Sequence, residues 1–234
     1  MNRSRRVAFF GGSFDPPHCG HLAIARAARD RLGLERVLFA PVGLQPLKQG
    51  GARAGFEDRV AMTRLAIAGE DGFELSLVDS PSDAPWDGLD SDAGGPPNYT
   101  AETLERLRAE MPGDALYLLV GADSLRTLKR WHRAKEIPFL ARLIVASRPG
   151  ERMEDAGAIA ACLPEGVCAE QDGEDGFRLR TAEGLESVLT LLPELHYEIS
   201  ATEVREAIRA GGMTTSGVIP EAVLGYIRER GLYR

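Results

Sequence analysis

The sequence predicts an α/β protein with a doubly wound parallel sheet and a small helical extension at its C-terminus. Short apolar runs alternate along most of the chain with segments whose apolar residues recur at helical spacing, and such alternation produces parallel sheets with right-handed crossovers. Several apolar runs also end at glycine or proline, as at Gly11-Gly12, Pro41-Val42 and Gly121. Because ligands of such sheets bind beyond the carboxyl ends of the strands, we expect the binding site there.

The individual elements follow from composition and from breaker residues. The run ALYLLV at 115–120 is apolar enough for a strand buried on both faces. Gly33 follows the first helix as a C′ residue, and Pro112-Gly113 stop a later helix. The expected strands span 7–10, 36–41, 73–78, 115–120 and 143–146, and the expected helices span 21–32, 56–68, 100–111 and 124–131.

Two segments and the tail complete the prediction. Residues 79–98 are rich in Asp, Ser, Gly and Pro and are expected to form an exposed loop, whereas residues 149–176 show no clear pattern. The tail from 202 to 233 contains two expected helices around Gly211-Gly212 and a Ser-Gly loop. We expect residues 1–199 to form one α/β domain, with residues 200–234 as a helical segment packed on it.

Composition limits the classes of function. The chain has 234 residues, 44% of them hydrophobic, and a net charge of −7, which argues against a general nucleic-acid binder. Its three cysteines, Cys19, Cys162 and Cys168, do not suggest a disulfide framework or a metal cluster, so a reducing cytoplasm fits. No signal peptide is expected, and no apolar run approaches the ~20 residues of a membrane span. Oligomeric state is not visible in the sequence.

The most informative segment reads VAFFGGSFDPPHCGH, from residue 7 to residue 21. It combines a strand, the turn Gly11-Gly12, and then His18 and His21 at the start of a helix. Glycines let the backbone approach phosphates, and a helix N-terminus attracts anions. Two imidazoles at that point can donate hydrogen bonds to charge that develops during phosphoryl chemistry. We therefore expect a nucleoside triphosphate here.

Other interpretations of this segment are weaker. The glycines could form only a tight turn, and a lone histidine is more often packed or solvated than catalytic. However, the chain has four histidines, and two of them lie here in HxGH spacing. A zinc site would need further ligands, and a dinucleotide fingerprint is absent because GGSFDPPHCG does not match G-x-G-x-x-G.

A second motif, ISATEVR, spans residues 199–205. Ser200 and Glu203 match the capping box S-x-x-E, which any helix start could use. Alternatively, Ser200, Thr202 and the first-turn amides could hold phosphate oxygens, which Arg205 would clamp with its planar fork. Alone, the motif favours the cap. Beside the first motif, it favours phosphate binding, and both can be true.

Together these segments resemble the HxGH nucleotidyltransferase superfamily, and within it bacterial nicotinate-nucleotide adenylyltransferase. The resemblance covers nearly the whole chain in the expected order. The matching segments are GGSFDPPHCGHL near the start, PPNYTAETL at 96–104, GADSLRTLKRWHR at 121–133, ISATEVR, and VIPEAVLGYIRERGLY at the end. HxGH identifies only the superfamily, whereas the YT..TL and LxxW segments narrow the resemblance to this family. The resemblance implies a Rossmann-like fold.

The resemblance also implies a reaction. ATP and nicotinate mononucleotide would give nicotinate adenine dinucleotide and pyrophosphate in NAD biosynthesis, with Mg²⁺ bound through the ATP phosphates and no covalent enzyme intermediate. Residues 200–234 would complete the ATP site. Nicotinate mononucleotide and ATP are thus the expected partners, and neither nucleic acid nor a membrane is expected.

Residue roles carry over by position. His18, His21 and Arg205 would be catalytic, and the ring of Trp131 would stack on the pyridine. The ATP site would comprise Gly11, Gly12, Ser13, Phe14, Gly121, Asp123, Ser200 and Thr202, and the acceptor site Lys48, Thr100, Trp131 and His132. Thr100 could instead be only a helix N-cap, and Trp131 an ordinary half-buried residue.

Three departures from the family pattern leave alternatives open. Leu47 stands where relatives often have histidine, Ala201 replaces a serine, and Cys19 lies within the ATP site. Leu47 and Ala201 motivate one alternative, a nucleotide-binding protein with impaired catalysis. Another is a related nucleotidyltransferase with a different acceptor. The YT..TL and LxxW segments argue against pantetheine phosphate and glycerol phosphate, but nicotinamide mononucleotide remains an alternative.

Overall fold

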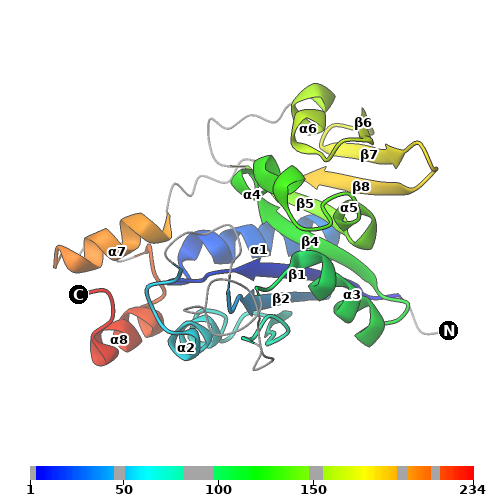
Figure 1. Ribbon diagram of the computed structural model, residues 1–234. Helices are drawn as coiled ribbons and strands as arrows, with labels where there is room; N and C mark the ends of the chain where they lie inside the picture. The colour runs from blue at the N-terminus through cyan, green and yellow to red at the C-terminus, as the bar shows by residue number, and fades with distance from the viewer. Residues whose placement is uncertain (1–3, 45–50, 82–96, 148–154, 194–199, 212–216) are drawn as a thin grey trace. The chain divides into compact units, whose positions relative to one another are not determined.

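The computed structural model describes residues 4–44, 51–81, 97–147, 155–193, 200–211 and 217–234. Within this part of the chain the strands form an eight-stranded sheet in the order β3-β2-β1-β4-β5-β8-β7-β6, and the predicted Rossmann-like α/β class is confirmed (Figure 1). The strands are β1 (Arg6–Gly12), β2 (Arg36–Pro41), β3 (Phe73–Leu75), β4 (Ala115–Gly121), β5 (Arg142–Ala146), β6 (Val167–Gln171), β7 (Gly176–Thr181) and β8 (Glu186–Leu191). The helices are α1 (Cys19–Leu32), α2 (Phe56–Ala66), α3 (Thr100–Glu110), α4 (Ala122–Thr127), the 3₁₀ helix η1 (Leu128–Arg130), α5 (Ile137–Leu140), α6 (Ala156–Cys162), α7 (Ala201–Arg209) and α8 (Glu221–Arg230).

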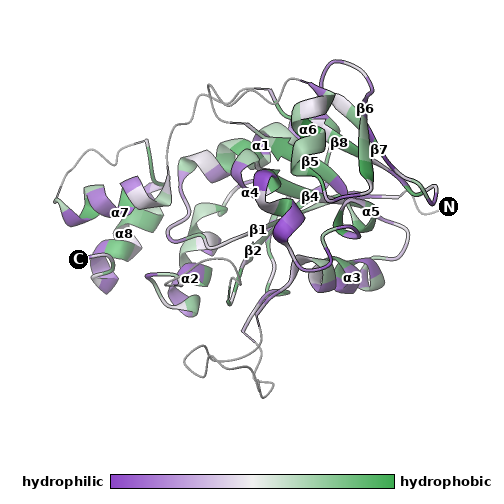
Figure 2. Cartoon of the chain, turned by 45° about the horizontal axis from the view of Figure 1, so that its top comes forward, coloured by the Kyte–Doolittle hydropathy of each residue, from purple (hydrophilic) through white to green (hydrophobic). Residues whose placement is uncertain are grey.

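The centre of the sheet is parallel, as predicted. β4 pairs with β1 on one side and with β5 on the other, and β8 continues the parallel arrangement beside β5. Leu119 in β4 and Ile144 in β5 are completely buried. Figure 2 shows both strands in the green of hydrophobic residues, because parallel strands covered on both faces need apolar side chains throughout.

One edge of the sheet is antiparallel, which the sequence did not indicate. β7 pairs in antiparallel fashion with β8 and with β6. Along β7, Phe177 and Leu179 are completely buried while Arg178 between them is exposed. A strand with one solvated face alternates in this way and has no continuous apolar run. This is why β6, β7 and β8 were missed, and why residues 149–176 showed no pattern although they include α6 and β6.

Smaller differences concern element boundaries. The predicted strand 73–78 is shorter, since β3 covers Phe73–Leu75 and lies at the end of the strand order. The predicted helix 124–131 begins at Ala122 and changes into η1 at Leu128. Gly33 adopts a φ of 56°, in agreement with its predicted place after α1, because this left-handed conformation suits glycine.

Residue contacts divide the chain into two compact units. Unit 1 comprises Met1–Phe10, Ile24–Val37 and Tyr99–His196, and unit 2 comprises Gly11–Ala23, Leu38–Asn98 and Tyr197–Arg234. In unit 1, the buried residues of β4 and β5 form the core together with Leu104 and Leu107 of α3. Each unit contains a part of the residues that the sequence singles out.

The core of unit 2 joins its C-terminal helices to α2. Met62 from α2, Val204 from α7, and Val223 and Ile227 from α8 belong to one buried apolar cluster. The C-terminal helices α7 and α8 therefore bury apolar side chains within unit 2. The division into a domain at 1–199 and a helical segment at 200–234 stays a prediction.

Among the helices of the described residues, none combines enough length and apolar character to cross a bilayer.

Candidate active site

Two histidines lie together at the start of α1, in unit 2. β1 ends at Gly12, and residues 13–18 lead directly into α1. The ring centroids of His18 and His21 are 3.7 Å apart, and the ring planes are inclined by 34°. His18 is 6% exposed. The HxGH spacing brings the rings together because residues three apart share one face of a helical turn.

The main chain determines where His21 carries its proton. The backbone N–H of His18 donates a hydrogen bond to Nδ1 of His21, with 3.2 Å between the heavy atoms. A ring nitrogen that accepts a hydrogen bond holds no proton, so the neutral ring of His21 carries its proton on Nε2. His21 can therefore donate from Nε2, which is what stabilisation of an anionic phosphate requires.

Phe14 sets the shape of the loop between β1 and the histidines. Its φ is +46°, in the left-handed region, which costs a bulky residue on the order of 1–3 kcal/mol. Burial of the ring offsets this cost, since Phe14 is 2% exposed and its ring centroid lies 5.6 Å from that of Phe39 and 5.1 Å from that of His21. A Cβ at Gly12 would approach the Phe14 ring to 3.3 Å, so the second glycine makes room for this packing.

Arg205 reaches the same loop from α7. Its Nη1 donates to the carbonyl oxygen of Asp15 at 2.7 Å, and its Nη2 donates to Oγ1 of Thr202 at 3.0 Å. A guanidinium has five N–H donors, so three remain beyond these two bonds to described residues. The structure thus places a cation with spare donors against Asp15, the residue three positions before His18.

The predicted capping box at the start of α7 is confirmed. Ser200 Oγ accepts from the backbone N–H of Glu203 at 3.2 Å, and the Glu203 carboxylate accepts from the backbone N–H of Ser200 at 2.8 Å. The Ser200 hydroxyl also donates to Oε2 of Glu203 at 2.7 Å. Its hydrogen bonds are therefore those of a cap, and a phosphate would have to compete with Glu203 for its proton.

Arg59 is a residue of this region that the sequence analysis missed. It is buried in α2, where its Nη1 donates to the carbonyl oxygen of Ser13 at 2.8 Å and its Nη2 donates to that of Val42 at 2.9 Å. Desolvation lowers the pKa of the Arg59 guanidinium, and the nearby charge of Asp15 opposes this. A signal existed, since Arg59 lies on the same helical face as the buried Met62 and Thr63.

Asp15 and Tyr233 were also missed, although both lie in segments that the sequence analysis quoted. Asp15 is buried, and Oδ1 of its carboxylate accepts a hydrogen bond from the Tyr233 hydroxyl at 2.7 Å. Neither received a role, because no local pattern relates the first loop to the end of the chain.

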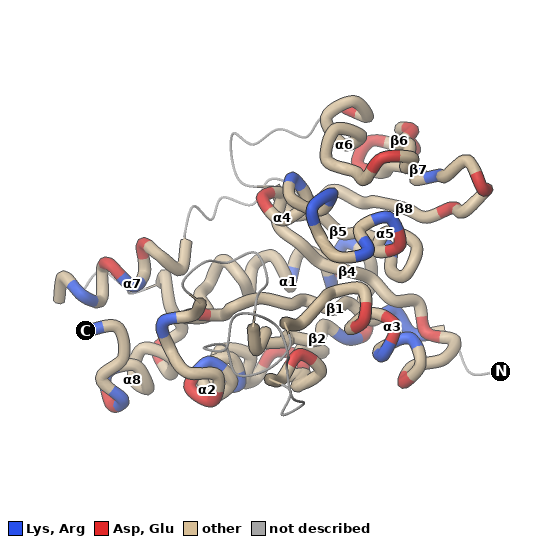
Figure 3. Tube along the Cα trace, in the orientation of Figure 1, with Lys and Arg blue, Asp and Glu red and all other residues tan. Residues whose placement is uncertain are grey.

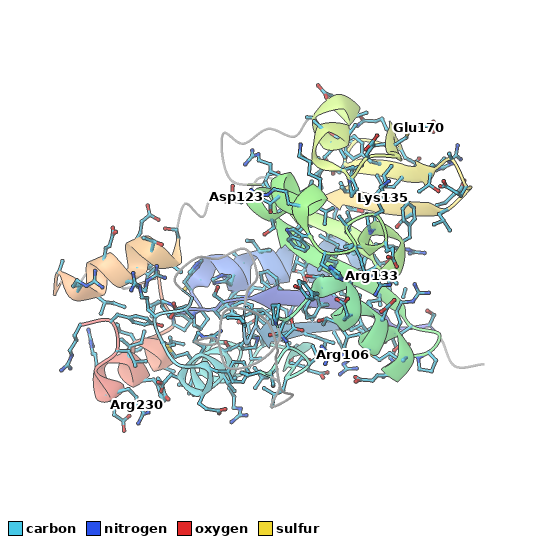
Figure 4. The ribbon with its side chains drawn as sticks, in the orientation of Figure 1. Arg106, Asp123, Arg133, Lys135, Glu170 and Arg230 are labelled. Atoms are coloured by element: carbon cyan, nitrogen blue, oxygen red, sulfur yellow. The ribbon has the colours of Figure 1, made fainter. Side chains whose placement is uncertain are left out.

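In unit 1, Gly121 and Asp123 lie at the junction of β4 and α4. Gly121 is the N-cap of α4, and a Cβ placed on it would meet no atom within 4 Å. The fold itself therefore does not require glycine here. Asp123 is exposed at the start of α4, where it forms an ion pair with Arg126 at 3.2 Å (Figure 4).

Trp131 and His132 follow η1, also in unit 1. Nε1 of Trp131 donates to Oγ1 of Thr127 at 3.2 Å. The ring of His132 stacks on that of Tyr99, with centroids 4.4 Å apart, and its Nε2 lies 3.3 Å from Oε1 of Glu102. The structure thus brings the start of α3 and the LKRWHR segment together.

Thr100 is the first residue of α3, and Tyr99 occupies the N-cap position before it. The alternative role of Thr100 as an N-cap is therefore wrong by one residue. The physical reason is that the backbone of Tyr99 is still extended, with φ and ψ of −102° and 127°, while Thr100 is already helical.

Basic residues are frequent in the segment around Trp131 and His132. They are Arg126, Lys129, Arg130, Arg133 and Lys135. Figure 3 shows several blue stretches along the chain from α4 to α5. Arg133 adopts a φ of +52° and donates to Glu105 at 2.9 Å and to Glu136 at 2.9 Å. The hydrogen bond to Glu136, followed by that to Glu105, raises the pKa of Arg133. Both bonds also fix the backbone directly after His132.

Two further points concern Lys48 and metal ions. Lys48, predicted to bind the acceptor, lies outside the described residues, as does Leu47. Over the described ranges, no group of three or more His, Cys, Asp or Glu side chains could hold a metal ion.

The mostly parallel sheet, with a histidine pair and an arginine at the loop after β1, defines a nucleotidyltransferase. Residues 9–207 match the cytidylyltransferase-like family. Two curated proteins named "Probable nicotinate-nucleotide adenylyltransferase" are similar over their length. That of Gloeobacter violaceus is 37% identical over 97% of this chain and 96% of its own, and that of Solibacter usitatus is 34% identical over 97% and 99%. The chain belongs to the nicotinate-nucleotide adenylyltransferase family.

The fold agrees with this assignment. The solved structure of Plasmodium falciparum nicotinic acid mononucleotide adenylyltransferase complexed with NaAD superimposes with a TM-score of 0.69. The superposition covers 98% of this chain and 97% of the other, at 16% sequence identity. At this identity, the likeness concerns the fold alone.

Proposed function

We propose that this chain transfers the adenylyl group of ATP to nicotinate mononucleotide and releases pyrophosphate, as a step in NAD biosynthesis. Its family membership supports this reaction. The observation that carries the proposal is the meeting of the histidine loop and Arg205 at Asp15, with 2.7 Å between Nη1 of Arg205 and the Asp15 carbonyl oxygen. Imidazole and guanidinium donors thus flank one loop, as a polyphosphate requires.

The proposed step is an in-line displacement. A phosphate oxygen of nicotinate mononucleotide forms a new P–O bond to the α-phosphorus of ATP, while the bond between that phosphorus and the bridging oxygen to the β-phosphate breaks. The bonding electrons leave with pyrophosphate. Because the attacking phosphate is already ionised, the protein needs no general base, and catalysis consists of positioning and charge stabilisation. Alignment of two reactants can remove roughly 7–11 kcal/mol of the barrier.

The described geometry supports a division of roles. His21 donates from Nε2 to the α-phosphate, His18 supports the same charge, and Arg205 binds the departing β- and γ-phosphates through its spare donors. The glycine loop of Gly11, Gly12, Ser13 and Phe14 borders the triphosphate, with Ser200 and Thr202 at its β/γ end. Residues 200–234 thereby complete the ATP site.

The remaining roles belong to residues of unit 1 and to Lys48. Gly121 and Asp123 bind the ribose of ATP, and the open space beside Gly121 supports close approach of a ligand to the backbone. Trp131 stacks on the pyridine ring, backbone amides near Thr100 and His132 read its carboxylate, and Lys48 binds the acceptor phosphate. Basic residues around Trp131 favour an anionic acceptor.

Mg²⁺ fits this site as an ion carried by the substrate. The one acidic side chain within the histidine loop, Asp15, accepts three hydrogen bonds from protein donors. It is therefore already occupied, and phosphate oxygens of ATP remain as ligands of the kind that Mg²⁺ prefers. Bound in this way, Mg²⁺ would neutralise charge on the triphosphate.

The same proposal includes location in the cytoplasm, with neither nucleic acid nor a membrane as partner.

A panel of acceptors tests the proposal. The protein is incubated with ATP, Mg²⁺ and either nicotinate mononucleotide or nicotinamide mononucleotide, and both pyrophosphate and the dinucleotide product are measured. We expect faster turnover with the acid. Faster turnover with the amide would replace the acceptor, and ATP binding without pyrophosphate release from either would show a nucleotide-binding protein instead.

A further inference from the structure

The Asp15 carboxylate joins three segments of unit 2. It is 2% exposed and lies in the loop that leads from β1 to the histidines. Oδ2 accepts from the backbone N–H of Arg53 at 2.6 Å, and Oδ1 accepts from that of Ala54 at 3.0 Å. The third donor is the Tyr233 hydroxyl, at 2.7 Å from Oδ1. The penultimate residue of the chain is thus bound to the first loop.

Tyr233 is held in an unusual conformation to make this bond. α8 ends at Arg230 and is followed by the C-cap Gly231, whose φ of 64° turns the chain, and Tyr233 itself has a φ of 65°. Such a backbone costs a tyrosine on the order of 1–3 kcal/mol. Its ring belongs to the apolar cluster of α2 and α8, with Met62 and Ile227. Packing of the ring therefore directs the hydroxyl at Asp15.

The backbone carbonyl of Asp15 binds Arg205. The Asp15 carbonyl oxygen accepts from Nη1 of Arg205, and Oδ2 of its carboxylate lies 3.9 Å from the same nitrogen. One buried residue therefore connects Tyr233 to the arginine that the proposed function assigns to the pyrophosphate end. Displacement of Asp15 would move the Arg205 anchor and the loop before His18 together.

We propose that Tyr233 is a positioning residue for the adenylyl transfer, because its hydroxyl fixes Asp15 and thereby sets the place of Arg205 and of the histidine loop. This inference rests on the proposed function and deepens it. Burial, followed by the hydrogen bond to Asp15, raises the pKa of Tyr233. The hydroxyl therefore remains a donor at neutral pH.

The chain offers a matched control. Tyr226, on α8, donates from its hydroxyl to Oδ1 of Asp58 on α2 at 2.8 Å, and Arg230 donates to the same oxygen at 3.2 Å (Figure 4 labels Arg230). Tyr226→Phe and Tyr233→Phe each remove one hydroxyl that binds a carboxylate. Of these two hydroxyls, only that of Tyr233 binds a residue of the histidine loop, residues 13–18.

Steady-state kinetics of the two variants test the proposal. For Tyr233→Phe we expect kcat to fall roughly 10- to 100-fold, because small misplacement of reacting groups has effects of this size. The KM for nicotinate mononucleotide should not change, since its proposed contacts lie elsewhere in the sequence. Tyr226→Phe should retain the wild-type kcat. Both variants are assayed well below their melting midpoints.

Hydrogen exchange provides a readout that does not depend on activity. In Tyr233→Phe, the amides of Arg53 and Ala54 and those of the loop residues Ser13, Phe14, Asp15 and His18 should exchange faster than in wild type, while β4 and β5 stay protected. Equal kcat in the two variants would overturn the proposal. Unchanged protection of the loop in Tyr233→Phe would also overturn it. A uniform loss of protection over the whole protein would do the same, because it indicates only lower global stability. If the wild-type protein forms no dinucleotide, the proposed function fails, while hydrogen exchange still tests whether Tyr233 holds the loop.

Discussion

The backbone N–H of His18 donates to Nδ1 of His21 over 3.2 Å, so the residue that begins the HxGH motif determines the tautomer of the residue that ends it. A neutral His21 then carries its proton on Nε2, the nitrogen that can face a ligand. The spacing of the motif therefore has a chemical consequence beyond bringing two rings together. It prepares one imidazole as a hydrogen-bond donor.

Replacement of His21 tests this donor. His21→Ala should lower kcat by about two orders of magnitude or more, the usual cost of one lost donor to a developing charge, with little change in melting midpoint. His21→Gln places an amide nitrogen near the position of Nε2 and should retain more activity than the alanine variant. Activity of His21→Ala near that of wild type would remove this residue from the mechanism.

Arg205→Lys tests whether the planar fork is required. Lysine keeps the charge but cannot donate to the Asp15 carbonyl and to Thr202 in the same geometry, so we expect kcat/KM for ATP to fall roughly 10- to 100-fold. Arg209→Lys, on the exposed end of the same helix, is the control and should match wild type. Equal kinetics of the two variants would show that charge alone is sufficient.

The two roles of Ser200 can be separated. Ser200→Ala removes the N-cap and should lower the free energy of unfolding by about 1 kcal/mol in urea denaturation. If the hydroxyl also binds phosphate, this variant should raise the KM for ATP. Glu203→Ala disrupts the same capping box while leaving the hydroxyl in place, so it should reduce stability without that rise. Identical KM values in both variants would leave Ser200 as a cap only.

Arg59 should be a large contributor to stability. Arg59→Leu leaves the carbonyl oxygens of Ser13 and Val42 without their buried donors and removes one of the cations near Asp15. Breaking a buried charged network costs roughly 3–5 kcal/mol, which urea denaturation would detect. Arg64→Leu changes an exposed residue of the same helix and should alter stability by about 0.5 kcal/mol or less. A small effect of Arg59→Leu would contradict the assignment.

The pKa of Tyr233 predicts a loss of stability at alkaline pH. Burial, followed by the bond to Asp15, raises this pKa above its ordinary value of 10.0, so the folded state keeps a proton that the unfolded state releases. The stability that this raised pKa contributes to the folded state is fully present below pH 10.0 and is lost as the pH rises further. Above this pH, the free energy of unfolding should therefore fall more steeply for wild type than for Tyr233→Phe. Parallel pH profiles would contradict the raised pKa.

The sequence predicted the parallel centre of the sheet because the strands there are apolar along their whole length. It did not indicate the antiparallel edge, because Phe177 and Leu179 in β7 are separated by exposed Arg178. A short alternating segment in a polar context has too few apolar residues to stand out. Pairing with β8, rather than local composition, makes it a strand.

Of the candidate site, the sequence could predict those parts that local geometry generates. The HxGH spacing, the capping box of Ser200 and Glu203, and the glycine at the end of β4 are all readable within a few residues. Arg59 could have been noticed as a charge on a buried helical face, but its acceptors, two backbone carbonyls, carry no sequence signal.

By itself, the sequence determined the fold class and the family, and it predicted that the histidine segment donates hydrogen bonds, because each of these depends on motifs whose residues lie close together in the chain. Only the tertiary structure decided which side chains hold that segment in place. Asp15 and Tyr233 are separated by 218 positions, and Asp15 and Arg205 by 190. Their meeting depends on the packing of α2, α7 and α8 in one apolar core, since folding buries Asp15 and leaves its oxygens to the donors that the core brings to it.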